Sequence, residues 1–304
     1  MPRVIRTILY LSLLLLPVTG CLQRTHKLEL PTSSANLEQA TLNQLVDRIN
    51  ADAQKVKTLN ATVDFATSVG GQKKGKVTEY QEIRGYILIR KPSMLRMIGL
   101  FPVVRNRAFD MVSNGDTFKL SIPVKNKFII GSRDVLSPSK NTLENLRPQH
   151  ILDALLVREI DPSREIAVLE AGTEVVRDPK SKKNVEQASY TVDVIQKEGD
   201  GSWILGRKIF ISRTDLLPTK QVVYDRFGNI ATSATYSSYS GQYGVVFPNV
   251  INIERPQEEY SVQIGVVKLR INDPLKDEQF DLPQPAGVEV QRLDQPKTAQ
   301  TVTK

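Results

Sequence analysis

The chain carries an apolar strand, a turn and a return strand at Gly85-Tyr86-Ile87-Leu88-Ile89-Arg90-Lys91-Pro92-Ser93-Met94-Leu95-Arg96. Lys91-Pro92 marks a tight turn, because proline fixes one backbone dihedral and favours extended backbone before it. Both faces of the first strand are apolar from Tyr86 to Ile89, so alternation alone does not assign either face to water. The stretch predicts two successive strands of a meander.

Strand-like patterns continue on both sides of this stretch. Asn114-Gly115, further along, is the strongest short hairpin signal. We expect a sheet of roughly eleven strands. Thirteen segments have strand character: Thr62–Thr67, Val77–Arg90, Met94–Gly99, Arg107–Ser113, Thr117–Ile122, Lys127–Ile130, Glu165–Ala171, Ala188–Lys197, Trp203–Ser212, Thr219–Asp225, Ile230–Tyr239, Val250–Glu254 and Tyr260–Ile271.

Two helical segments interrupt the strands. The first begins near Asn36, which can cap it, and has apolar residues at three- and four-residue spacing: Leu42, Leu45, Val46, Ile49, Ala53 and Val56. The second covers about residues 139–157, with Pro148 suited to a first helical turn. Its apolar face is formed by Ile151, Leu152, Leu155 and Leu156. Both apolar stripes require an apolar surface to cover.

This element order predicts one α+β domain over residues 36–290, followed by a polar tail over residues 291–304. Roughly eleven strands are too many for a flat open sheet without strong curling. We therefore expect an incomplete, half-open antiparallel β-barrel with its helices against the concave face as a lid.

Composition excludes several classes of protein. Of 304 residues, 40% are hydrophobic and 24% are charged, which is a globular composition. One cysteine cannot form an internal disulfide, and one cysteine with two histidines argues against a Cys/His zinc site. The sequence contains no phosphate loop, dinucleotide fingerprint, Gly-x-Ser-x-Gly or His-Glu-x-x-His motif. Metal ligands and catalytic residues are therefore not expected.

The first twenty residues have the zones of a signal peptide. Arg3 and Arg6 precede an apolar run over residues 8–16, which is too short to span a bilayer. The residues Val18-Thr19-Gly20-Cys21 then resemble the lipobox of bacterial lipoproteins. That resemblance implies cleavage before Cys21, a diacylglyceryl group on its thiol and an acyl group on the new amine. A buried structural cysteine is the alternative.

The lipobox also suggests a compartment. The resemblance implies that an aspartate directly after the cysteine favours retention at the inner membrane in many Gram-negative cells. Here Leu22 occupies that position. We therefore expect a lipid anchor in the outer membrane, with the protein facing the periplasm. Residues 21–35 then form a polar tether. Removal of the leader lowers the net charge from +8 to +6.

The stretch Gly85–Arg96 resembles the signature of the bacterial lipoprotein localisation factors, the LolA/LolB superfamily. Val112–Phe118 is similar to the hairpin that follows in that family, and Phe280–Pro283 with Gly287–Val290 resembles its closing strand. The resemblance implies an incomplete barrel covered by helices, with an apolar cavity that holds acyl chains. It implies binding and transfer of lipid without a covalent step.

A loop between two of these strands matches a feature of the receptor branch of the family. In that branch a proline is followed by an exposed leucine that delivers lipoprotein to the membrane. Here Val103 follows Pro102, with Leu100 and Phe101 beside it. The resemblance predicts that this loop contacts a membrane or a partner. The alternative is that it packs under the lid as core.

The cavity wall is predicted from residues that alternate along strands. Each of them could equally be an ordinary core residue. The candidates are Phe65, Ile87, Ile89, Leu95, Met97, Phe109, Met111, Phe118, Leu120, Trp203 and Ile209.

The leading hypothesis is a lipid-anchored protein that binds acyl chains of lipoproteins or of another envelope lipid, with a periplasmic carrier protein as a candidate partner. The second is a non-catalytic assembly lipoprotein whose half-barrel is filled by its own side chains and serves docking. An envelope hydrolase is a third. Export removes nucleic acid as a partner, and the basic turns at 73–76 and 180–183 are expected to be solvated. Cavity volume discriminates the first two hypotheses.

Overall fold

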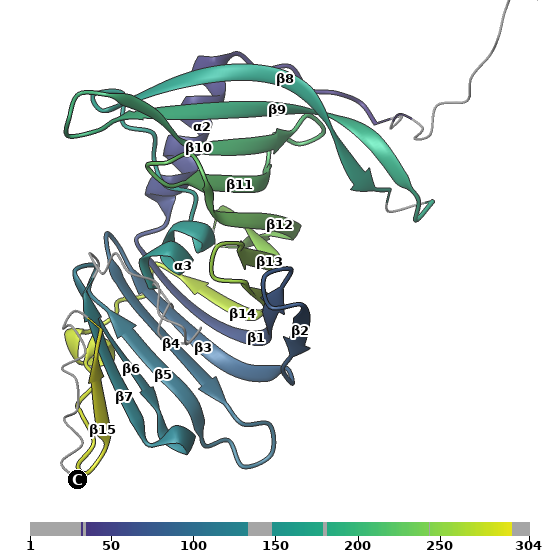
Figure 1. Ribbon diagram of the computed structural model, residues 1–304. Helices are drawn as coiled ribbons and strands as arrows, with labels where there is room; N and C mark the ends of the chain where they lie inside the picture. The colour runs from purple at the N-terminus through teal and green to yellow at the C-terminus, as the bar shows by residue number, and fades with distance from the viewer. Residues whose placement is uncertain (1–31, 33–34, 133–147, 179–180, 243, 294–304) are drawn as a thin grey trace, which may run out of the picture. The chain divides into compact units, whose positions relative to one another are not determined.

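The computed structural model describes residue 32 and residues 35–132, 148–178, 181–242 and 244–293 (Figure 1). The chain divides into two compact units: the larger comprises Ala35–Glu174 and Gln187–Lys304, and the smaller comprises Met1–Ser34 and Val175–Glu186. The contacts discussed below lie within the larger unit. The predicted signal peptide, the lipobox with Cys21 and most of the predicted tether and polar tail lie outside the described residues.

The described residues form two α-helices, two short 3-10 helices and fifteen strands. The helices are α2 (Leu42–Lys55), α3 (Pro148–Leu155), η1 (Pro123–Lys125) and η3 (Asp277–Phe280). The first seven strands are β1 (Thr58–Gly71), β2 (Lys76–Glu79), β3 (Ile83–Arg90), β4 (Met94–Leu100), β5 (Arg107–Ser113), β6 (Thr117–Ile122) and β7 (Lys127–Ser132). The others are β8 (Glu165–Arg177), β9 (Asn184–Lys197), β10 (Trp203–Ser212), β11 (Pro218–Tyr224), β12 (Ile230–Gln242), β13 (Val245–Arg255), β14 (Tyr260–Ile271) and β15 (Glu289–Arg292).

All fifteen strands belong to one sheet, whose order is β15-β7-β6-β5-β4-β3-β1-β14-β13-β12-β11-β10-β9-β8, with β2 paired to β1. From β7 to β9 neighbouring strands pair antiparallel. β15 joins β7 in parallel. The two ends of this order, β15 and β8, do not pair with each other, so the sheet is open in the described part of the chain.

The predicted strand number was too low, because the sheet has fifteen strands rather than roughly eleven. The segment Val77–Arg90, expected as one strand, is divided into β2 and β3. All four residues of β2 are exposed, so no buried face holds this segment in the register of β3. Of the predicted closing strand, Phe280–Pro283 is not a strand, since Phe280 ends η3, and only the region of β15 at Glu289–Arg292 joins the sheet. The parallel pairing of β15 with β7 also departs from the expected antiparallel sheet.

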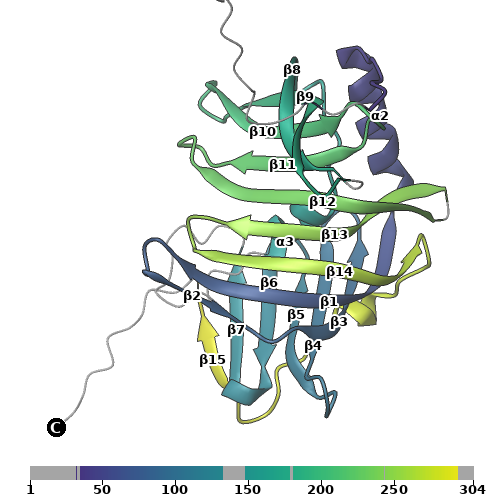
Figure 2. The same ribbon diagram turned by 90° about the vertical axis from the view of Figure 1, so that its right-hand side faces the viewer.

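The main core lies on the inner face of the curled sheet. Within the larger unit, α3 lies inside this curl in both views (Figures 1 and 2). Ile151, Leu152 and Leu155 of α3 are buried in one cluster with inward-facing residues of β1, β3–β6 and β12–β14. These side chains come from alternate strand positions, as in the facing triple Ala61, Ile87 and Met97. The helix therefore fills space that the curl of the sheet would otherwise leave empty.

α2 covers a second cluster. Its buried Leu45 and Ile49 pack with residues of β9 and β10, including Val192 and Ile209. The Asn50 amide donates to the Ile160 carbonyl oxygen at 3.1 Å, and its oxygen accepts from the Ile160 amide at 2.8 Å. The amphipathic stripe predicted this helix and its buried face.

The predicted start of α2 at Asn36 is wrong. The helix begins at Leu42, and Thr41 caps it in a capping box with Gln44. A Thr-x-x-Gln pair satisfies two backbone donors at once, which favours this start over a lone asparagine upstream.

The outer face of β4–β7 is covered by the chain after β14. Leu275, Phe280 and Leu282 are buried there with Val112 and Phe128. This explains why residues on both sides of these strands are apolar: Met111 faces the inner cluster, whereas Val112 faces the outer one. The same burial accounts for the apolar residues at successive positions of β3, whose Leu88 packs against this cluster.

Candidate functional site

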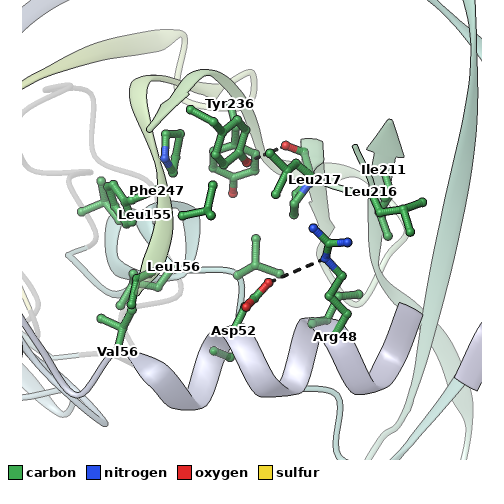
Figure 3. A pocket seen from close by; sticks show the side chains of 18 of the residues that line it. Arg48, Asp52, Val56, Leu155, Leu156, Ile211, Leu216, Leu217, Tyr236 and Phe247 are labelled. Carbon is green, nitrogen blue, oxygen red and sulfur yellow. Dashed lines mark hydrogen bonds and ion pairs between the residues drawn. The ribbon is translucent and has the colours of Figure 1, made fainter. Parts of the chain in front are cut away.

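An apolar pocket lies between α2, the end of α3 and strands β12 and β13 (Figure 3). Five segments that are distant in sequence form its wall. The lining residues are Leu45, Arg48, Ile49, Asp52 and Ala53 of α2 and its C-cap Val56, Lys91, Leu155–Val157, Ile211, Leu216–Pro218, Tyr236, Tyr239 and Val245–Pro248. Aliphatic and aromatic side chains predominate, so the pocket suits a hydrocarbon group.

The pocket is small as it stands. Its volume is about 90 Å³, whereas pockets that bury a drug-sized ligand measure about 300–1,000 Å³. An acyl chain of a lipid does not fit without movement of the wall. The volume therefore agrees with an inner face filled by its own side chains.

Charged groups of α2 stand at the rim. Figure 3 shows Arg48 and Asp52, whose Nε and Oδ2 atoms lie 4.0 Å apart. Lys55 approaches the same carboxylate at 2.6 Å, and Arg48 also donates to the Asp215 carbonyl oxygen at 3.0 Å. These side chains are 40–49% exposed, so the ion pairs contribute little free energy of folding.

Two tyrosine hydroxyls of β12 face the pocket wall. Tyr236 donates to the Ala154 carbonyl oxygen at 2.8 Å, and Tyr239 donates to the Pro218 carbonyl oxygen at 2.6 Å. Burial raises the pKa of both hydroxyls well above the ordinary value of 10.0. Both tyrosines therefore stay neutral and serve as donors that fix the wall.

A lysine also belongs to the lining. The Lys91 ammonium donates to the Ala53 carbonyl oxygen near the end of α2. Burial lowers the pKa of this ammonium, and the carboxylate of Glu159 partly opposes that effect. Lys91 thus ties the turn between β3 and β4 to α2.

Further polar side chains of the sheet hold the backbone that leaves α3. The Gln221 amide donates to the Asp153 carbonyl oxygen at 2.9 Å. The Arg207 guanidinium donates to the carbonyl oxygens of Arg158 at 3.3 Å and Glu159 at 2.8 Å. Gln221 and Tyr236 thus satisfy carbonyl groups in the last turn of the short helix, which lack partners within it. Arg207 satisfies those of the segment that follows the helix.

Arg207 also belongs to a buried charge cluster. Its side chain is 2% exposed and lies 3.2 Å from the Glu165 carboxylate, which is 4% exposed. Arg158 contacts the other oxygen of the same carboxylate at 2.5 Å. Burial, reinforced by the like charge of Arg158, lowers the pKa of Arg207 to about 10. Removal of one partner from such a cluster leaves an uncompensated charge.

The structure places the eleven predicted cavity residues outside the lining of this pocket. Eight of them are buried in the main core: Phe65, Ile87, Ile89, Leu95, Met97, Met111, Phe118 and Leu120. Phe109 packs against that core and Ile209 lies under α2. Trp203 is 49% exposed, with the Lys197 ammonium 5.9 Å from its ring centroid. Contact with an acyl chain stays a prediction for all of them.

The alternation rule could not identify the true lining. Leu155 and Leu156 were part of the predicted apolar face of the second helix, and Leu45 to Val56 belonged to the first stripe. Tyr236, Tyr239 and Phe247 carried no signal that distinguishes a pocket from a core. Only the approach of β12 and β13 to α2 reveals their shared role.

The loop between β4 and β5 is at the surface. Val103 is 92% exposed and Val104 is 64% exposed, whereas Leu100 and Phe101 are half-buried. The Arg105 amide donates to the Phe101 carbonyl oxygen at 3.1 Å, which closes the loop. An exposed aliphatic tip is the geometry that contact with a membrane or a partner requires.

A second pocket, open to solvent and with a volume of about 360 Å³, lies on the opposite face of the sheet. It is lined by Asn60, Thr62, Tyr86, Leu88, Ile98, Lys268 and Arg270.

Among the described residues, no group of three or more His, Cys, Asp or Glu side chains gathers to hold a metal ion. None of the described helices is long and apolar enough to cross a membrane.

Together these features define a class of protein: a long, open, mostly antiparallel sheet that curls around a short helix and carries an apolar pocket. A DUF1329 family protein from Desulfovibrio piger has this fold, with 15% identity and a TM-score of 0.51 over 78% of this chain and 94% of its own. No family model matches the chain, and no curated protein matches it in sequence.

Two further solved structures each align with a TM-score of 0.47 and 13% identity over 78% of this chain. One is a domain from Vibrio parahaemolyticus described as an outer membrane lipoprotein-sorting protein, of which 94% is covered. The other is a LolA superfamily protein from Nitrosomonas europaea, of which 97% is covered. Both are similarities at low identity and with TM-scores below 0.5, and they assign no role to this chain.

Proposed function

We propose that this chain is a lipid-anchored envelope protein that binds acyl chains at the pocket between α2, α3 and β12–β13. The anchor is Cys21, acylated after cleavage behind Val18-Thr19-Gly20. The protein faces the periplasm from the outer membrane, and residues 36–290 form the lidded half-barrel. Its ligands are acyl chains of lipoproteins or of another envelope lipid, received from a periplasmic carrier protein, and no bond is made or broken.

The observation that carries this proposal is the apolar wall that α3 shares with the pocket. Leu155 lines the pocket, and Ile151 and Leu152 of the same helix fill the inner face of the sheet. Burial of a methylene contributes about 0.8 kcal/mol whether it belongs to a side chain or to a lipid. In this proposal an acyl chain offsets the apolar contacts that α3 gives up when the helix moves outward, whereas the hydrogen bonds of Tyr236 and Gln221 to α3 oppose that movement. We assign the 90 Å³ space to the closed state.

The small volume favours a second candidate function. In that case the half-barrel is permanently filled by α3, and the protein is a non-catalytic assembly lipoprotein that docks other proteins. The two functions share the anchor and the fold. They differ in whether the α3 segment leaves the inner face.

The loop at Leu100, Phe101 and Val103 belongs to the same proposal. We assign it contact with the membrane at which lipid is delivered. Its support is the family resemblance together with the 92% exposure of Val103. A half-buried Phe101 at the base gives the loop an apolar stem.

The test is mass spectrometry of lipid that copurifies with a form beginning at Leu22. Val246, at the pocket, is 49% exposed on β13, and Val267, outside it, is 52% exposed on β14. We expect stoichiometric lipid with the wild type and with Val267→Trp, and depleted lipid with Val246→Trp. A well-folded wild type without lipid would refute acyl-chain binding and leave the docking function.

The anchor is tested separately. Full-length protein should incorporate labelled palmitate, and Cys21→Ala should abolish the label and release the protein from membranes. Labelling that persists in Cys21→Ala would refute the anchor.

A further inference from the structure

Two exposed turns lie at the same end of neighbouring strands. The first is the loop Phe101–Asn106 between β4 and β5, and the second is the turn Pro123–Asn126 between β6 and β7, which contains η1. Strands β5 and β6 pair antiparallel, with Asp110 opposite Ser121. The start of β5 and the end of β6 therefore lie at the same end of the sheet, which we call the docking edge. Both views place the two turns close together at the lower end of the sheet (Figures 1 and 2).

Each turn presents an aliphatic tip to solvent. Val103 and Val104 are 92% and 64% exposed, and Val124 is 71% exposed. A proline precedes the valine in both turns, at Pro102 and Pro123, and limits the backbone freedom of the tip. Exposure of three valines to water is unfavourable in free energy. Contact of these side chains with an apolar phase removes that cost.

Cations stand directly behind both tips. Arg105 and Lys125 are exposed, and neither forms an ion pair with a described residue. Arg107 and Lys127 are the first residues of β5 and β7, and each forms an ion pair. Arg107 lies 3.0 Å from Asp110, and Lys127 lies 3.9 Å from Glu289. The edge therefore carries a positive charge immediately beside its apolar tips.

We propose that the two turns form one docking edge for an anionic phospholipid surface, with Val103, Val104 and Val124 in the acyl boundary and Arg105 and Lys125 at the phosphates. In a membrane interface the acyl chains lie deeper than the anionic phosphates. Short apolar tips with cations behind them therefore place valines at the acyl chains and positive charge at the phosphates. Protein interfaces instead favour broad patches rich in aromatic residues. This inference rests partly on the proposed membrane contact of the β4–β5 loop, and it adds a second turn and a lipid class.

The test uses the form beginning at Leu22, which lacks the anchor, in flotation with vesicles. The vesicles consist of phosphatidylcholine, with or without about 30 mol% phosphatidylglycerol. We expect binding to anionic vesicles to exceed binding to neutral ones by about tenfold or more. Val124→Glu and Lys125→Glu should each lower that binding by about fivefold or more. The control Val77→Glu alters a valine that is 60% exposed on β2 and should bind like the wild type.

The outcomes separate this inference from the proposed loop function. If Val103→Glu abolishes binding while Val124→Glu and Lys125→Glu bind like the wild type, the two-turn edge is refuted and the loop function stands. Equal binding to neutral and anionic vesicles refutes the anionic preference. No binding to either vesicle refutes both the edge and the loop as membrane contacts. A thermal unfolding midpoint near that of the wild type confirms that each variant is folded, as expected for exposed positions.

Discussion

The Tyr236 hydroxyl donates a 2.8 Å hydrogen bond to the Ala154 carbonyl oxygen, which ties the middle of β12 to the last turn of α3. Both groups are buried, so water cannot replace either partner. Tyr236 also lines the pocket, where Leu155 follows Ala154 along the chain. The bond thus joins the wall of the proposed acyl-chain site to the helix that fills the inner face.

Tyr236→Phe should make α3 easier to displace. We expect a loss of about 1 kcal/mol in the free energy of unfolding, because one buried hydrogen bond disappears and the ring remains. Uptake of a fluorescent fatty acid should become faster. The matched control is Tyr190→Phe, which removes a hydroxyl bonded to the Ala40 amide under α2 and should leave uptake unchanged. Faster uptake in both variants would show that general loosening, rather than α3, controls access.

Stability at high pH should report the two buried tyrosines. Tyr236 and Tyr239 have a raised pKa in the folded state, so they keep their protons while the unfolded chain loses them above about pH 10. Their contribution is therefore complete below pH 10 and is lost as the pH rises. At pH 11 the loss is about 1.4 kcal/mol for each tyrosine.

The measurement is urea unfolding of the wild type and of Tyr236→Phe/Tyr239→Phe between pH 8 and 11. The stability difference should be constant below about pH 9 and shrink above pH 10. Arg207, whose pKa is lowered to about 10, acts in the opposite direction, but both proteins contain it. A stability difference independent of pH would contradict the burial of both hydroxyls.

Arg207→Met should be strongly destabilising. The substitution leaves the buried Glu165 carboxylate with Arg158 and the Asp161 amide as its partners, and it removes the donors to two carbonyl groups. The expected loss is about 3–5 kcal/mol. Lys208→Met is the control, since its ion pair with Asp193 is 22–25% exposed and should contribute no more than about 1 kcal/mol. Comparable losses in urea unfolding would show that the buried cluster has no special role.

Gly85→Ala tests the packing of the β3–β4 hairpin. A Cβ atom there would lie 2.1 Å from the Ile98 carbonyl oxygen and 2.6 Å from the Phe65 ring. We expect a loss of about 2–3 kcal/mol from overpacking. A Cβ atom at Gly172 on β8 meets no atom within 4 Å, so Gly172→Ala should change stability by less than about 0.5 kcal/mol. Equal effects of the two variants would contradict this packing.

Local sequence patterns predicted the elements well where one face of an element is buried. The stripe from Leu45 to Ala53 fixed the buried face of α2, because helical periodicity requires those residues to share a side. The start of α2 was wrong, because the sequence offers two caps and only the Thr41–Gln44 pair is reciprocal. Strand character along β3–β6 was also correct, whereas the exposed β2 gave no periodic signal and was joined to β3.

The site could not be predicted in the same way. Leu155 and Phe247 meet only because β12 and β13 pass beside α3, and no local pattern encodes that meeting. The inward alternation of Ile87 and Met97 identified buried residues correctly, yet alternation cannot distinguish a packed core from a cavity wall. The closing segment at Phe280 covers the outer face, which explains why both faces of β3 were apolar.

Photo-crosslinking with a fatty acid that carries a diazirine at its chain end tests the central claim most directly. The probe is applied to the form beginning at Leu22, and the labelled peptides are mapped by mass spectrometry. Acyl-chain binding at the pocket predicts label within Leu155–Val157 and Val245–Pro248, with loss of label when unlabelled fatty acid is added in excess. Label that cannot be competed away, or label confined to the second pocket around Tyr86 and Lys268, would contradict it.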